Sequence, residues 1–248
     1  MEGTALPSGF PVIAPPLVGR ALSEQQWKSV AFLHWRVEPE LVAPMLPVGT
    51  VPDCLDGMTY VGLVAFRMHD AGLGVGMPLP FLGTFPETNV RLYSRDAQGR
   101  HGVVFRSLEA TRLLTVLAAR ILYRVPYAWS HMRVLQRGSR WRYRSVRRWP
   151  NPAPTSDLML RVGEPVNPSA VEVFLTARWG LHSRLGGRTV FTPNEHDPWP
   201  LHEATLIRCT DELVGAAGLA VGHGPDLRVL WSPGVRTRFG APVAVTRT

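Results

Sequence analysis

The amino-acid sequence predicts a mainly β (α+β) protein in which one domain takes up most of the 248 residues. Three observations support this prediction. Short runs of β-branched and aromatic residues recur along the chain, and several alternate polar with apolar positions at the period of two that strands require. Glycine and proline are numerous, with 23 residues of each, as expected for many strands joined by turns. Hydrophobic residues make up 45% of the chain, which is ample for a core.

The first third of the chain predicts an arm, two strands and a short helix. Residues 1–22 contain four prolines and are expected to form an extended, loose arm. Val30–Val37 alternates in the manner of a strand, and Tyr60–Arg67 is nearly all apolar, which is typical of a central strand. Pro39–Leu46 predicts a short helix, because Pro39 suits a first helical turn and Pro47 lies beyond its end.

The most informative stretch is a predicted hairpin that begins at residue 85. Alternation places four polar side chains on one face of its first strand, namely Glu87, Asn89, Arg91 and Tyr93. The other face is mostly apolar and consists of Thr88, Val90 and Leu92. A turn at Asp96–Gly99 leads into a returning strand over Gly102–Ser107.

A helix is expected after this hairpin. Ser107 suits a helix N-cap, and the carboxylate of Glu109 would lie in the first turn, where it complements the helix dipole. Apolar residues between Leu113 and Arg120 continue at helical spacing.

The second half of the chain predicts further strands and one well-capped helix. Ser169 and Glu172 have the spacing of a capping box, and the helix that they begin is expected to end near Gly180. Arg178 would then be placed to pair with an acidic residue of the central strand. Leu201–Thr210 and Leu227–Trp231 are predicted strands.

The polar row of the hairpin is the candidate functional site. A carboxylate, an amide, a guanidinium and a phenol on one face offer an acid or base, an anion clamp and two orienting groups. Such a row is more commonly the solvent side of a half-buried antiparallel sheet. If it faced the inside of a barrel, however, it would be a site.

These residues also carry a resemblance to the DUF2071 (YqjF-like) family. The blocks that match follow one another in order: Glu87-x-Asn89-x-Arg91-x-Tyr93, Gly102 to Ala110, Pro126-Tyr127, Tyr143-x-Ser145, Glu172 to Trp179, and His196 to Leu201. The similarity extends from about Trp27 to Pro233. It implies an acetoacetate decarboxylase-like fold, a curled antiparallel β-barrel with a few packed helices, over residues 23–248. The family has no known function, so the resemblance implies a fold more than a chemistry.

Lysine content bears directly on the chemistry that the resemblance implies. Acetoacetate decarboxylases form a Schiff base through a lysine whose pKa is lowered by a cationic neighbour. The only lysine of this chain is Lys28, which precedes the first predicted strand, whereas the equivalent position is expected near residues 103–107. Arginine stays protonated and cannot replace it. We therefore predict no Schiff-base decarboxylation.

Three functions remain open. The first is an enzyme of lyase, hydratase or isomerase type that performs non-covalent acid–base chemistry on a small carboxylate or carbonyl compound. The second is a non-catalytic protein that binds a small anionic molecule. The third is a protein in which the polar row is purely structural. The candidate catalytic residues are Glu87 and Tyr93. The candidate substrate-binding residues are Arg91, Asn89, Arg178, His34 and Ser107. A lone histidine on a strand, such as His34, is more often structural. No cofactor is expected.

A metal site and a nucleic-acid site are both disfavoured. His196, His202 and Glu203 fit no tight ligand motif, and His196 is expected to pack beside Trp199 as a structural corner. The net charge is +8, but the basic cluster Arg140–Ser145 alternates, so its aromatic residues lie opposite its arginines and are not placed to stack on bases.

The remaining features concern location and assembly. Cys54 and Cys209 make neither a disulfide framework nor a CxxC pair. The sequence shows no signal peptide and no apolar run of the ~18 residues needed to cross a membrane. A cytoplasmic protein is therefore expected. An exposed edge of a curled sheet would favour a homo-oligomer.

Overall fold

The computed structural model describes residues 4–72, 75–76, 83–111, 126–149 and 154–246. The strands are β1 (Ser23–Val37), β2 (Thr50–Pro52), β3 (Thr59–His69), β4 (Phe85–Asp96), β5 (His101–Ala110), β6 (Tyr127–Arg137), β7 (Arg140–Trp149), β8 (Thr155–Pro165), β9 (Gly180–Leu185), β10 (Arg188–Glu195), β11 (His202–Asp211), β12 (Leu230–Phe239) and β13 (Val243–Ala244). The helices are α1 (Pro39–Val42), the 3-10 helix η1 (Ala43–Met45), α3 (Ala170–Thr176) and α4 (Leu213–Ala216). The prediction of a mainly β protein with a few helices is confirmed.

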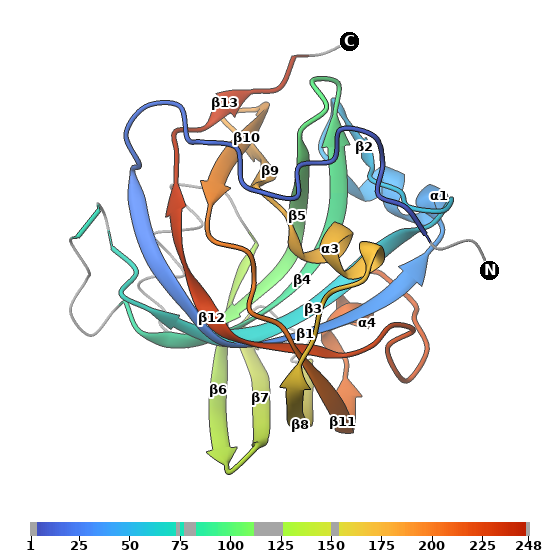
Figure 1. Cartoon of the computed structure of the whole chain (residues 1–248), viewed down its shortest axis with the longest axis vertical. Helices are drawn as coiled ribbons and strands as arrows, with labels where there is room; N and C mark the ends of the chain where they lie inside the picture. Colours follow the sequence, from blue (N-terminus) through green and yellow to red (C-terminus); the bar gives the residue numbers. More distant parts are fainter. Residues whose placement is uncertain (1–3, 73–74, 77–82, 112–125, 150–153, 247–248) are drawn as a thin grey trace.

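The strands form one sheet that closes on itself (Figure 1). The order is β13-β10-β9-β5-β6-β7-β8-β11-β12-β1-β3-β4-β2, and additional pairings join β10 to β12 and β5 to β4. Most pairings are antiparallel, but β5 pairs in parallel with both β6 and β9. In place of the expected antiparallel barrel, the strands form a curled ring in which two of the strand pairings are parallel.

Strands β1, β3 and β4 lie side by side and bear a buried layer on each face. One face packs Leu63 and Leu92 into a core that also holds Trp141 and Leu158 from the β7 and β8 side. The other face carries a second apolar cluster that includes Phe66. The alternation predicted for β4 thus places its apolar row in the first core and its polar row on the opposite face.

The hairpin from residue 85 to residue 110 differs from the prediction at its end. Gly99 takes a φ of 75° in the turn, as expected. Ser107 does not cap a helix, however, because β5 continues to Ala110. Glu109 pairs with Thr88 of β4 on one side and with Ala128 of β6 on the other, so strand pairing overrides the local capping signal. The helix expected over residues 113–120 lies outside the described residues.

In the basic cluster Arg140–Ser145 of β7, the aromatic residues lie inside. Trp141 and Tyr143 are buried, whereas Arg140 and Arg144 are exposed. Arg142 makes two hydrogen bonds of 2.8 and 2.6 Å to Asp157 of β8. The rings of Trp141 and Tyr143 therefore lie opposite the exposed arginines, as the alternation predicted, whereas Trp129 and Trp149 of the same hairpin are exposed.

Helix α3 starts at the predicted capping box but ends earlier than expected, at Thr176. The backbone N–H and the hydroxyl of Ser169 both donate to the Glu172 carboxylate, at 2.7 and 2.9 Å. The chain then runs through Arg178 into β9, so that this arginine lies just beyond the helix.

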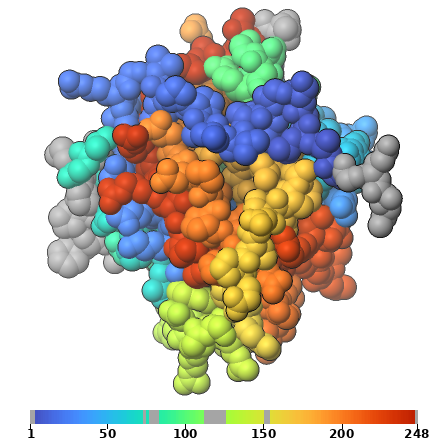
Figure 2. Space-filling model, in the orientation of Figure 1, coloured from blue at the N-terminus to red at the C-terminus, as the bar shows by residue number. Residues whose placement is uncertain are grey.

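The N-terminal arm packs onto the ring instead of being loose. Figure 2 shows it lying across one face of the molecule, over the region of α3 and β10. Phe10 is buried against His101 and Phe174, with ring centroids 4.8 and 5.4 Å away. The indole of Trp179 donates to the Pro11 carbonyl at 2.6 Å. Within the described residues, no helix is both long and apolar enough to cross a membrane.

Candidate functional site

The polar face of β4 opens into a cavity of about 480 Å³. Strand alternation aims Glu87, Asn89 and Arg91 into this space. Its walls are mostly apolar, with contributions from β1, β3, β4, β5 and the segment after β10: Trp27, Val30, Phe32, Val64, Phe66, Met68, Phe85, Phe105 and Trp199. Polar side chains such as Tyr127, Arg178 and His196 also line it, and a mostly apolar cavity of this volume with convergent polar groups is typical of small-molecule sites.

Glu87 is a buried carboxyl group with two hydrogen-bond donors. Tyr127 of β6 donates its hydroxyl to one Glu87 oxygen at 3.0 Å, and the Asn89 amide donates to the other at 3.4 Å. Burial raises the pKa of Glu87 to about 7, although these two bonds oppose the rise. No arginine, lysine or histidine pairs with Glu87 among the ion pairs of the described residues. The group can therefore gain or lose a proton near neutral pH.

Arg91 brings a positive charge to the same cavity. Its Nε donates to the Tyr93 hydroxyl at 3.1 Å and its Nη2 to the Leu175 carbonyl at 3.1 Å. The guanidinium carbon lies 5.7 Å from the Phe32 ring centre. No carboxylate forms an ion pair with Arg91 in the described part of the chain. A partly buried guanidinium without a carboxylate partner has the charge and the donors to hold an anion.

Tyr93 and His34 support Arg91 from behind. The Tyr93 hydroxyl lies 2.7 Å from the Nε2 atom of His34 on β1. Burial, then Arg91 and Arg178, lower the pKa of His34 well below its usual value, so the ring is neutral at pH 7. Neither Tyr93 nor His34 is among the cavity walls. The structure thus assembles both with Arg91, but at a position where they orient the guanidinium and do not face a bound molecule.

Gly62 makes room for this support. A Cβ atom at this position would lie 3.0 Å from the Tyr93 hydroxyl oxygen and 3.1 Å from the Cδ2 atom of His34. We expect Gly62→Ala to lower the free energy of unfolding by about 1–3 kcal/mol, because the packed rings must shift. Urea denaturation would measure this loss. Gly215→Ala is the control, since its Cβ would meet nothing within 4 Å, and an equal loss in both variants would contradict the prediction.

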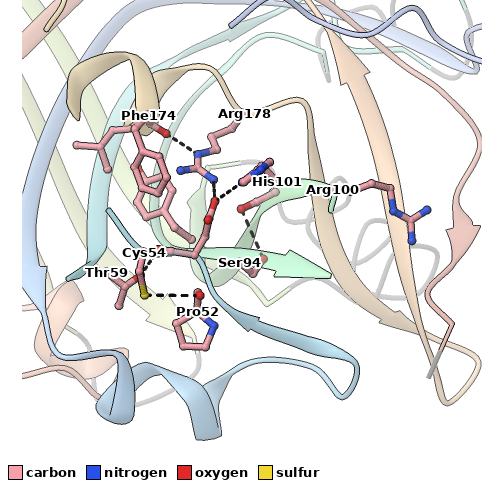
Figure 3. A network of polar contacts seen from close by, with 12 residues as sticks. Pro52, Cys54, Thr59, Ser94, Arg100, His101, Phe174 and Arg178 are labelled. Atoms are coloured by element: carbon pink, nitrogen blue, oxygen red, sulfur yellow. Dashed lines mark hydrogen bonds and ion pairs between the residues drawn. The ribbon is translucent and has the colours of Figure 1, made fainter. Parts of the chain in front are cut away.

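Arg178 is the second guanidinium of the cavity wall, and it forms an ion pair with a buried carboxylate. Figure 3 shows Arg178 and His101 converging on one side chain, the carboxylate of Asp53. Arg178 bonds to Asp53 through Nη1 and to the Phe174 carbonyl through Nε at 2.7 Å, while His101 Nδ1 lies 2.7 Å from the same Asp53 oxygen. The acid expected on the central strand is instead Asp53, which follows β2. Burial disfavours the charge on Asp53, but Arg178 and then His101 outweigh it and lower its pKa.

Four buried polar atoms on the cavity-lining residues lack a hydrogen-bond partner within the described residues. They are Trp27 Nε1, Asn89 Oδ1, Arg178 Nη2 and Asn194 Oδ1. Buried polar atoms are nearly always paired in folded proteins, and each unpaired one costs free energy. These atoms leave unmet hydrogen-bonding capacity on the residues around one cavity.

His196 also lines the cavity, which sequence reasoning missed. It packs between Trp179 and Trp199, with ring centroids 4.7 and 5.0 Å away, so the expected contact with Trp199 is confirmed. Its Nδ1 lies 2.7 Å from the Asp197 carbonyl. Because a carbonyl only accepts, Nδ1 carries the proton and Nε2 is an acceptor. Burial lowers the pKa of His196 to about 4, so the ring is neutral at pH 7.

Ser107 does not belong to this cavity. Its hydroxyl donates to Glu109, and Arg147 donates to it at 2.8 Å. Ser130 of β6 completes this cluster with a bond of 2.5 Å to Glu109. None of the four residues lines the cavity. The structure therefore separates Ser107 from the other predicted binding residues, because its side chain points to the opposite face of β5 from Leu108.

Comparison with known proteins bears on the identity of this chain. Residues 24–236 match DUF2071, described as an uncharacterized conserved protein. The chain belongs to the DUF2071 family. A DUF2071 relative, the uncharacterized protein YqjF of Bacillus subtilis (strain 168), is 24% identical over 208 residues, which are 83% of this chain and 86% of YqjF. The resemblance seen in the sequence is confirmed.

Solved structures similar to this DUF2071 chain include acetoacetate decarboxylase-like enzymes. Acetoacetate decarboxylase from Legionella pneumophila has a TM-score of 0.64 at 12% identity, covering 96% of this chain and 93% of the enzyme. An acetoacetate decarboxylase-like enzyme from Sphingomonas wittichii RW1 has a TM-score of 0.60 at 14% identity, covering 98% and 100%. The enduracididine biosynthesis enzyme MppR complexed with pyruvate has a TM-score of 0.61 at 13% identity, covering 98% and 97%. At these identities the likeness shows the fold alone, and it confirms the fold that was expected.

The only lysine of this DUF2071 chain lies away from the cavity. Lys28 is within β1, not before it as expected from the sequence, and its side chain is exposed. It is not among the cavity walls. Phe105 of β5 lines the cavity within the segment where the decarboxylase lysine was expected, and phenylalanine has no amine to form a Schiff base.

Proposed function

We propose that this protein is an enzyme that binds a small carboxylate through Arg91 and moves a proton on it through Glu87, without a covalent intermediate. One observation carries the proposal. A single, mostly apolar cavity contains both a guanidinium that has no carboxylate partner in the described residues and a carboxyl group whose pKa is raised to about 7.

Each half of this observation has a chemical consequence. A carboxyl group that titrates near pH 7 is present in both forms, which suits a general acid or base at that pH. The mostly apolar walls lower the local dielectric constant, which strengthens the attraction between Arg91 and an anion. Because Lys28 lies elsewhere, the proposed chemistry is restricted to proton transfer. Hydration, dehydration and isomerisation are the corresponding reaction types.

The solved neighbours supply a starting set of probes. MppR, which has the same fold, is complexed with pyruvate in one structure and with a condensation product of pyruvate in another. Pyruvate combines a carboxylate with a carbonyl group whose neighbouring C–H bonds are acidic. Oxo acids are therefore suitable test ligands for a site with one anion clamp and one proton-transfer group.

A non-catalytic ligand-binding protein is the second candidate. Both oxygens of Glu87 already accept hydrogen bonds, from Tyr127 and Asn89, which also fits a group that only holds the wall together. A purely structural polar row is less well supported, because such a network should satisfy all of its members. Asn89 Oδ1 and Arg178 Nη2 instead have no partner in the described structure.

Binding is tested by calorimetric titration of three oxo acids, namely pyruvate, 2-oxooctanoate and 7-oxooctanoate. We expect at least one to bind, and Arg91→Met to weaken its binding about 30-fold or more, since a buried charge pair is lost. Arg95→Met is the matched control, because Arg95 lies on the same strand but is exposed and outside the cavity. Equal losses in the two variants would argue against an anion site at Arg91.

Proton transfer is tested by exchange of the C–H groups beside the carbonyl with deuterium in D₂O, followed by NMR. We expect the protein to catalyse exchange of the oxo acid that binds. Glu87→Gln should reduce the rate about 10²–10⁴-fold while binding persists. Binding without any catalysed exchange would reject the enzyme and leave the ligand-binding candidate.

A further inference from the structure

The two chemical groups of the proposed site lie far apart along one strand. Glu87 and Arg91 are four residues apart on β4, so their Cα atoms are separated by about 13 Å at about 3.3 Å per residue. The pairing of β4 with β3 is regular over this span, with Glu87 beside Phe66 and Arg91 beside Gly62. The pairing of β4 with β5 shifts register between Val90 and Arg91, but the extra residue is Arg106 of β5, so the shift does not shorten β4.

Their side chains do not close this gap. Arg91 Nε donates to Tyr93, which lies two residues further from Glu87, and Nη2 donates to Leu175. Glu87 is held by Tyr127 of β6 and by Asn89. A molecule in contact with both groups therefore has to extend along the row.

The net charge of the side chains at the Arg91 end of the cavity favours a ligand group with a single negative charge. Asp53 neutralises Arg178, and His34 is neutral because its pKa is lowered well below its usual value. Arg91 is then the one cation without a carboxylate partner among these groups. One positive charge matches a carboxylate better than a phosphate group, which carries about two negative charges near pH 7.

The walls at the Glu87 end are apolar. In the register of the sheet, Glu87 lies beside Phe66, and the next inward pair is Phe85 beside Met68. Trp27 of β1 pairs with Met68 and also lines the cavity. The volume of about 480 Å³ is in the range of sites for drug-sized ligands and far exceeds what a molecule such as pyruvate would fill.

We infer that the substrate is an elongated monocarboxylate, with its carboxylate on Arg91 and its reactive carbonyl near the far end of an apolar chain, beside Glu87. This inference rests on the proposed function and specifies its substrate class. In the proton-transfer step, the Glu87 carboxylate takes a proton from the carbon next to the carbonyl. The C–H electron pair passes into the enolate, and Glu87 then returns a proton to the same carbon.

Two isomeric acids test the inference on the wild-type protein. 2-Oxooctanoate and 7-oxooctanoate have the same formula, charge and length and differ only in the distance between carboxylate and carbonyl. After subtraction of the rate in buffer, we expect deuterium exchange beside the carbonyl to be at least about tenfold faster for 7-oxooctanoate, because only this isomer places those C–H groups at Glu87. Octanoate should inhibit by competition, whereas acetate at the same concentration should not.

The outcomes separate the two proposals. Equal exchange of the isomers, or faster exchange of 2-oxooctanoate, that is lost in Glu87→Gln would overturn the elongated substrate and leave the proposed function intact. Exchange of pyruvate alone that depends on Glu87 would also overturn only the elongated substrate. Exchange that is undetectable for pyruvate and both isomers, or unchanged in Glu87→Gln, would overturn both proposals. Faster exchange of 7-oxooctanoate that depends on Glu87 supports both.

Discussion

Asp53→Asn is expected to lower the free energy of unfolding at pH 7 by about 3–5 kcal/mol. Both Asp53 and Arg178 are nearly inaccessible, with side chains 3% exposed, so the substitution leaves a buried guanidinium without a counter-charge. His101 loses its charged partner at the same time. Urea denaturation of the two proteins would measure the difference.

The pH dependence of this loss provides a second readout. Arg178 and His101 overcome the effect of burial and lower the pKa of Asp53, so the carboxylate stabilises the folded state at pH values above its unfolded pKa. That contribution is lost as the pH falls through the lower pKa of the folded state. The stability advantage of the wild type over Asp53→Asn should therefore shrink in acid. An advantage that grows in acid would contradict this assignment.

Asp157→Asn is the matched control for an ion pair near the surface. Asp157 binds Arg142 at 2.6 Å, but the arginine side chain is 31% exposed. Solvent screens such pairs, and we expect a loss of at most about 1 kcal/mol. If the two aspartate variants lost similar amounts of stability, burial would not be what distinguishes Asp53.

The polar row of β4 could be predicted because it depends only on strand periodicity. Glu87, Asn89 and Arg91 share a face in any strand that contains them, and the structure places all three on the cavity wall. Strand periodicity predicts which face of the sheet a side chain occupies, but not whether that side chain is covered or reaches the cavity. Tyr93 shares that face, yet it is covered and reaches the cavity only through Arg91.

The partners of the row could not be predicted in the same way. Tyr127, Asp53 and His196 come from segments after β5, β2 and β10, and no local pattern brings these together. Only the closure of the ring does so, through pairings between residues far apart in the sequence. Local signals also failed where such pairings compete with them. Ser107 has the chemistry of an N-cap, but β4 pairs with Ser107 and β6 pairs with the residues that follow it, so the backbone stays extended.

Glu87→Gln is expected to remove the loss of folding stability that the wild-type protein suffers as the pH rises. Burial raises the pKa of Glu87 from 4.5 to about 7, so between these values the folded state binds a proton that the unfolded state has released. Wild-type stability therefore falls as the pH rises through this window, by about 3 kcal/mol between pH 4.5 and pH 8.5. Glutamine stays neutral and is free of this cost. The free energy of unfolding of Glu87→Gln, relative to wild type, should rise by that amount across the window.

Glu172→Gln is the control, because Glu172 is a carboxylate with the opposite shift. Arg228 and Ser169 overcome its burial and lower its pKa, so its contribution to stability is complete above the unfolded pKa and is lost only in acid. The difference between wild type and Glu172→Gln should therefore stay flat from about pH 5 to pH 8.5. A flat difference for Glu87→Gln as well would show that Glu87 ionises at an ordinary pKa. In that case the cavity would hold a permanent anion, and Glu87 would not serve as a proton donor near neutral pH.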